Sequence, residues 1–180
     1  AVPGLRVVVP VRASSYWQSF ISTFWEQRGP TVLVAHRSLH DLEEEEIEEM
    51  IQAPDGAEVQ LVPIGDALLV AAEASKELRV KHGVTAAVTP LEELSRAALS
   101  EITREGIPQV MVMTASAGLG FEGVSSRFVP LPASAGLEPL WYPSASEVCD
   151  AALCALGRPS GKISGATPVG YERDGRKEAF

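Results

Sequence analysis

The segment Leu5–Ser38, LRVVVPVRASSYWQSFISTFWEQRGPTVLVAHRS, has the pattern of a strand, a helix and a second strand. Leu5–Val9 is a short apolar run rich in β-branched residues, which suits a buried parallel strand. Ser14–Gln27 places aromatic and aliphatic residues at helical spacing, and a Gly-Pro sequence follows where the helix must end. Thr31–Ala35 is a second apolar run. The segment therefore predicts a βαβ unit with parallel strands and a right-handed crossover.

The remainder of the chain continues this alternation of short apolar runs and amphipathic segments. We expect further strands at Glu58–Ile64, Val84–Val88, Gln109–Met113, Ser126–Leu131 and Lys162–Pro168, and helices at Leu39–Gln52, Ala67–His82, Leu91–Glu105 and Ser146–Leu156. Strands that alternate with helices indicate a doubly wound parallel sheet. The predicted fold is a truncated Rossmann-like α/β domain of three layers, α/β/α, over residues 1–170, followed by a polar tail at 171–180.

The composition excludes several classes of function. The chain has 180 residues, and 46% hydrophobic with 22% charged residues is typical of a globular domain with a core. A net charge of −9 argues against nucleic acid or an anionic membrane as a partner. No stretch has the length of a membrane span, and we expect no secretory signal. We expect a soluble intracellular protein, located in the cytoplasm or, after removal of a targeting segment, in an organelle matrix.

Neither the cysteines nor the histidines form a metal-binding pattern. Cys149 and Cys154 lie five positions apart on a predicted helix, a spacing that favours buried free thiols. His36 and His40 are four positions apart, but they fall at a strand end and in a loop rather than on one helix face. Together with His82 they are expected to be solvated, and no metal site is predicted.

The order and content of the segments resemble the short-chain dehydrogenase/reductase family. The resemblance rests on the first βαβ unit, on a strand ending VPIGD at residues 62–66, on a helix ending KHG at 81–83, on VMVMTASAGL at 110–119, and on SEVCDAALCAL at 146–156 followed by ISG at 163–165. It covers roughly residues 5–170. It implies a Rossmann-like fold and, in active members, an NADP(H)- or NAD(H)-dependent oxidoreductase.

The family's glycine-rich turn is absent. It would fall on Val11, Ser15 and Trp17, and residues 10–17 contain no glycine. A dinucleotide site needs glycines there for the tight turn and for close approach of the backbone to the pyrophosphate. The β-branched Val11 disfavours a positive φ, and Trp17 places an indole where a phosphate would lie. The family's Asn-Asn-Ala-Gly segment would fall near residues 86–89, which read AAVT and do not match.

The family's catalytic residues are also replaced. Its serine would fall on Ala115, between Thr114 and Ser116, its tyrosine on Phe128 and its lysine on Pro132. In the family the tyrosine protonates the carbonyl oxygen and the lysine lowers the pKa of that tyrosine. Phenylalanine has no proton to give. No tyrosine anywhere in the chain has a lysine four residues later, so no helix can present that pair on one face.

A few residues remain as candidates for binding a cofactor, and each also has a plainer interpretation. Arg12, Ser14 and Ser15 lie in the first βα turn, where the arginine can neutralise a phosphate or simply be a lone surface charge. Arg37 follows the second strand, where NADP-preferring family members hold a 2′-phosphate, but it also fits a surface arginine. Asp66 is either an adenine contact or a helix cap. The expectation is therefore no cofactor, with NADP(H) as the candidate if one binds.

These absences predict a non-catalytic domain that acts as a structural or regulatory subunit of a larger assembly. The chain is short for the family between Val88 and Gln109 and between Gly123 and Ser146, where the family's active-site helices lie. A protein partner, such as an active homologous subunit, would then cover the exposed sheet. Trp141-Tyr142 either anchors such a partner or packs on its own domain. The alternatives are an NADP(H)-dependent oxidoreductase with an atypical or partner-completed site, and a small-molecule-binding domain without redox chemistry.

Overall fold

The computed structural model describes residues 5–26, 29–113, 125–126 and 143–159. The predicted strand 162–168, the tail 171–180 and the Trp141-Tyr142 dipeptide lie outside these ranges. None of the described helices is long and apolar enough to cross a membrane.

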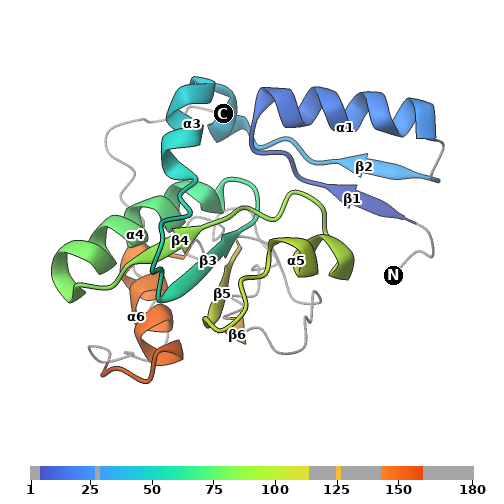
Figure 1. Cartoon of the computed structure of the whole chain (residues 1–180). Helices are drawn as coiled ribbons and strands as arrows, with labels where there is room; N and C mark the ends of the chain where they lie inside the picture. Colours follow the sequence, from blue (N-terminus) through green and yellow to red (C-terminus); the bar gives the residue numbers. More distant parts are fainter. Residues whose placement is uncertain (1–4, 27–28, 114–124, 127–142, 160–180) are drawn as a thin grey trace, which may run out of the picture.

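The predicted βαβ unit at the start of the chain is confirmed. Strand β1 (Arg6–Val8), helix α1 (Ala13–Glu26) and strand β2 (Thr31–Leu33) follow one another, and the strands pair in parallel with Val7 opposite Val32. Figure 1 shows α1 lying along this two-stranded sheet, beside the rest of the molecule. We refer to residues 5–35 as the first unit.

A second sheet of four parallel strands forms the centre of the molecule. Its spatial order is β4-β3-β5-β6. The chain enters at β3, adds β4 on one side and then crosses over to add β5 and β6 on the other side, so the topological switch point lies between β3 and β5. The elements are β3 (Val59–Pro63), α4 (Ala67–His82), β4 (Ala86–Val88), α5 (Arg96–Ile102), β5 (Gln109–Val112), β6 (Ser125–Ser126) and α6 (Ala145–Ala155).

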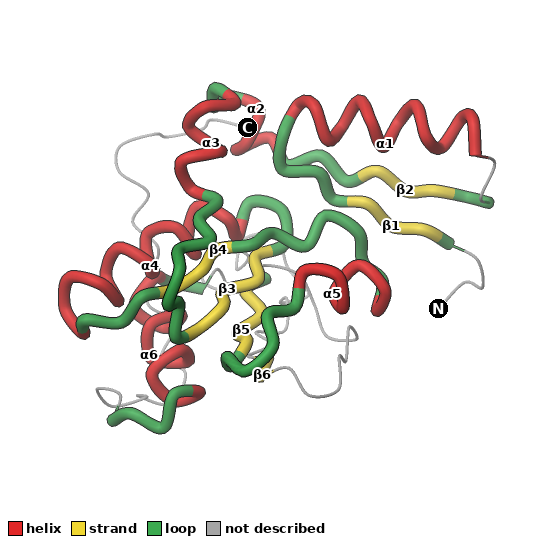
Figure 2. Tube along the Cα trace, viewed as in Figure 1, coloured by secondary structure: helices red, strands yellow, loops and turns green. Residues whose placement is uncertain are grey.

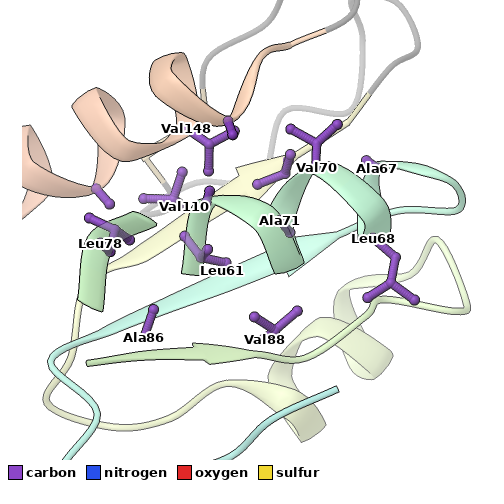
Figure 3. Packing of buried hydrophobic residues seen from close by; sticks show 14 of the residues in the cluster. Leu61, Ala67, Leu68, Val70, Ala71, Leu78, Ala86, Val88, Val110 and Val148 are labelled. Carbon is purple, nitrogen blue, oxygen red and sulfur yellow. The ribbon is translucent and has the colours of Figure 1, made fainter. Parts of the chain in front are cut away.

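Helices cover both faces of this sheet. On one face, α4 and α6 bury a large apolar cluster against the strands, with Leu61 and Val110 from the sheet meeting Leu78 and Val148 from the helices (Figure 3). On the other face, Val62 and Met111 meet Leu99 of α5, and the partly buried Val7 and Val34 of the first unit pack on this cluster. The chain is thus a Rossmann-like, doubly wound α/β fold with three layers (Figure 2).

The first unit does not contribute its strands to the four-stranded sheet. In a dinucleotide-binding sheet with strand order 3-2-1-4-5-6 the first strand lies at the centre. Here β1 is joined to the rest of the fold by the segment before α5: Val9 N donates to Glu92 O at 2.7 Å and Leu94 N to Val7 O at 2.9 Å. The Arg6–Glu93 ion pair, at 2.8 Å, strengthens the same junction.

Two predicted helices have other bounds in the structure, because capping residues start a helix within each predicted range. The acidic segment predicted as one helix forms α2 (Arg37–His40) and α3 (Glu44–Met50), because Glu43 makes a capping box with Glu46 and starts a new helix. Helix α5 is shorter than predicted, since Ser95 caps it by accepting a hydrogen bond from Ala98 N at 3.1 Å.

The prediction of two buried thiols is correct for one of them. Cys149 lies between α6 and α4, is 2% exposed and donates to Ala74 O at 3.4 Å. Burial raises the pKa of its thiol to about 12, helped by the nearby Glu77. Cys154 is exposed, because the apolar face of α6 that meets α4 does not include it.

Candidate functional site

A pocket of about 300 Å³ lies beside the carboxyl ends of β1 and β2. The turn into α1 forms one side, and the segment running through α2 into α3 forms the other. Its polar members are Arg12, Tyr16, His36, His40 and Glu44. Ligands of α/β folds bind at the carboxyl ends of parallel strands, so this pocket is the candidate binding site.

Arg12 is the unsatisfied group of this pocket. It lies in the turn between β1 and α1, and its Nε atom is buried without a hydrogen-bond partner among the described residues. A buried donor without an acceptor costs free energy, of the order of 1–3 kcal/mol. The turn therefore holds a guanidinium group whose hydrogen-bonding capacity the described part of the chain does not fill.

His36 and Asp66 connect the first unit to the four-stranded sheet. His36 follows β2, Asp66 precedes α4, and His36 Nδ1 lies 3.2 Å from Asp66 Oδ1. Ser38 Oγ donates to the other carboxylate oxygen of Asp66 at 3.5 Å. The hydrogen bond from His36 to Asp66 raises the pKa of the imidazole; partial burial opposes this shift and the carboxylate charge adds to it.

Gly65 allows the imidazole to lie against the backbone of the β3–α4 turn. Its φ is +59°, and a Cβ placed on it would lie 2.2 Å from His36 Nε2. Such a distance is far inside van der Waals contact, so only glycine fits under the ring. The ring of His36 is thus fixed by Asp66 at one nitrogen and by the Gly65 backbone near the other.

The structure separates the predicted cofactor residues. Arg12 lines the pocket, and Asp66 adjoins it through His36. Asp66 occupies the N-cap position of α4 but makes no side-chain cap hydrogen bond, so its carboxylate serves the contact with His36 rather than a cap. Ser14 and Arg37 are exposed, and Ser14 donates to Glu44, while Ser15 is half-buried and does not line the pocket.

The positions carried over from the dehydrogenase resemblance cannot be placed. Thr114, Ala115, Ser116, Phe128 and Pro132 all lie outside the described residues. His36 was expected to be solvated, yet it is ion-paired and half-buried; the signal in the sequence was the polar run His-Arg-Ser directly after a strand. Within the described ranges, no group of three or more histidine, cysteine, aspartate or glutamate residues is arranged to hold a metal ion.

Comparison with known proteins gives one kind of information, the fold. No family model matches the chain, and no curated protein matches it. Among solved structures, transketolase from Leishmania mexicana is similar with a TM-score of 0.59 at 18% sequence identity. The similarity covers 86% of this chain and 26% of the transketolase chain, so this chain spans about a quarter of that enzyme's length. At this identity the likeness supports the α/β fold alone.

We expect Gly65→Ala to destabilise the protein more than Gly83→Ala does. Both glycines have a positive φ, +59° and +63°, but a Cβ at Gly83 meets no atom within 4 Å. Backbone strain alone costs about 1 kcal/mol, so Gly83→Ala measures that strain and Gly65→Ala adds the collision with His36. Urea unfolding of the two variants and of the double variant His36→Ala/Gly65→Ala tests this. Equal losses in both single variants would contradict the observed packing.

The His36–Asp66 pair also predicts a pH dependence of stability. The pKa of His36 is raised in the folded state, so the protonated imidazole stabilises the fold. This contribution is complete below the unfolded value of about 6.5 and is lost as the pH rises through the folded pKa. The free energy of unfolding should therefore differ more between wild type and His36→Asn at about pH 5.5 than at about pH 8.5. The exposed His82, changed to asparagine, serves as the control and should leave the pH profile unchanged.

Proposed function

We propose that this chain is a non-catalytic domain that serves as a structural or regulatory part of a larger assembly, with α1 as its contact surface. The observation that carries the proposal is the exposed aromatic face of α1. Trp25 is 82% exposed and Phe24 69%, and three further large apolar side chains on the same helix are exposed: Trp17, Phe20 and Ile21. We call these five residues the aromatic face.

The aromatic face has the composition of a protein interface. Its side chains recur at helical spacing, which from the sequence alone predicts a buried stripe. Within it Trp17 packs edge-on against Phe20, and Phe20 lies 5.3 Å from Phe24 between ring centroids. Tryptophan and other aromatic residues dominate the binding energy of interfaces, and large contiguous apolar patches on a protein surface mark binding sites. A protein partner would remove this surface from water.

The two-stranded sheet under α1 supports the same conclusion. Among the described strands, β2 pairs with β1 alone, and Val32 at its centre is 44% exposed. Parallel sheets occur almost only where both faces are covered, and open strand edges are sites of pairing with another chain. A partner that extends the sheet at β2 while covering α1 would complete the first unit.

The structural likeness to transketolase concerns the fold and favours neither function. The partner we propose is a protein, either an active homologous subunit or another domain. The relationship to short-chain dehydrogenases remains a prediction, and the fold alone assigns no function.

The alternative is an NADP(H)-dependent oxidoreductase whose site a partner completes. Its support is the unsatisfied Arg12 in a pocket at a strand edge. Against it stand the buried, β-branched Val11 in the turn and the position of β1 outside the four-stranded sheet. A dinucleotide site requires an open glycine turn at a central strand.

Nucleotide titration separates the two functions. Trp17 lines the pocket, so NADPH or NADH bound there should change the tryptophan fluorescence, and Trp17→Phe identifies the responding residue. We expect no saturable change in fluorescence up to about millimolar nucleotide. Any affinity would then be far weaker than a micromolar Kd, which corresponds to a binding free energy of about −8 kcal/mol. Saturable micromolar binding that Arg12→Met abolishes would favour the oxidoreductase and overturn the non-catalytic proposal.

The aromatic face is tested by charge substitution. In extracts of the source cells, the tagged chain should elute in a complex larger than the monomer, and Phe24→Glu/Trp25→Glu should elute as a monomer. Val80→Glu is the matched control, because Val80 is 83% exposed but lies alone on α4. Thermal unfolding of each variant shows that the fold is retained. Elution of the wild-type chain as a monomer would contradict an assembly role.

A further inference from the structure

We propose that the pocket beside β1 and β2 binds a small organic acid with a single carboxylate and an apolar body, the carboxylate being held by Arg12. This inference goes beyond the assembly role, which requires no ligand. It rests on three features of the pocket: its size, its unsatisfied guanidinium group and its apolar wall.

The pocket is large enough for a small molecule. A volume of about 300 Å³ is at the lower end of the range of ligand sites in proteins, which are concave, mostly apolar and hold a few convergent polar groups. Its two sides come from different elements, the first turn of α1 and the α2–α3 segment, and His36 is fixed at its edge by Asp66 and Gly65. The walls are thus held in place without a ligand.

The positive charge of Arg12 favours a negatively charged ligand. Its buried Nε lacks an acceptor among the described residues, and it takes part in none of the ion pairs found there. A guanidinium group presents a planar fork of donors that matches a carboxylate with two parallel hydrogen bonds. Because Arg12 lines the pocket, an anion bound there would give its guanidinium group an ionic partner that the described residues do not supply.

The surrounding charges favour one negative charge over two. Asp66 is paired with His36 Nδ1, and His36 Nε2 lies against the Gly65 backbone. Glu44 also lines the pocket and accepts a hydrogen bond from Ser14, so it places a negative charge near any bound anion. His40 and Tyr16 complete the titratable groups that line the pocket. A doubly charged phosphate ester would be repelled more by Glu44 than a carboxylate is.

The apolar side chains of the pocket favour a ligand whose uncharged part is apolar. Val11, Leu39 and Ile47 line it with apolar side chains that are each 5% exposed or less, and Trp17 adds an aromatic surface. Apolar groups of a ligand gain about 25 cal/mol per Å² of surface that such a wall removes from water. An acid with an aromatic or branched apolar group therefore fits the site.

Calorimetric titration of the full chain with phenylacetate tests the proposal. We expect saturable binding with one site per chain, accompanied by a change in tryptophan fluorescence, and at least a tenfold loss of affinity in Arg12→Met. Arg96→Met, which removes an exposed arginine of α5, is the matched control and should bind normally. Arg12→Met should unfold at the same temperature as wild type or higher, since it removes a buried donor without a partner, which shows that loss of binding is not loss of the fold.

Two further ligands sharpen the result. Neutral phenylacetamide, which lacks the charge, should not bind. Inorganic phosphate should bind more weakly than phenylacetate; equal or tighter binding of phosphate in competition with phenylacetate would overturn the assignment of a carboxylate. Absence of phenylacetate binding, or full binding by Arg12→Met, would overturn the site itself. The variant Phe24→Glu/Trp25→Glu should bind phenylacetate normally, so this test and that of the assembly role can fail separately.

Discussion

The contact between His36 and Asp66 joins the two parts of this fold beside the candidate site. It joins the end of β2 to the start of α4 at 3.2 Å, where no described strand of one sheet pairs with a described strand of the other. The ring reaches Asp66 only because residue 65 lacks a side chain. These two residues and the glycine therefore help to position the α2 segment, whose Leu39 is also anchored in the apolar core.

The sequence predicts the helices and strands of this fold better than it predicts how they pack and pair in space. Helix α4 was predicted with both of its ends, since alanine-rich periodicity and a following glycine are local signals. The stripe on α1 was predicted as well, but periodicity states that a face is apolar, not what covers it, and the structure leaves that face exposed. Strand order is equally non-local, and nothing in Leu5–Ala35 indicates that its strands lie outside the main sheet. The polar run after β2 marks His36 as a candidate, but nothing local indicates that its partner is Asp66, thirty residues later.

The candidate site illustrates why residue-by-residue transfer from a resembled family is insecure. Of the five cofactor candidates, Arg12 and Asp66 lie at or beside the pocket, whereas Ser14, Ser15 and Arg37 do not line it. The two that matter were chosen for contacts with a dinucleotide, yet Asp66 contacts a histidine and Arg12 lies beside apolar residues. The geometry of the site, rather than the fold around it, indicates what it can bind.

Helix α1 belongs to two surfaces at once. Its first turn forms a wall of the pocket, its outward side carries the aromatic face, and Trp17 is a member of both. A rigid helix cannot be displaced at one surface without being displaced at the other. A protein docked on the aromatic face and a molecule held in the pocket would both contact Trp17. By reciprocity, any factor by which the first altered the affinity for the second would also apply in reverse.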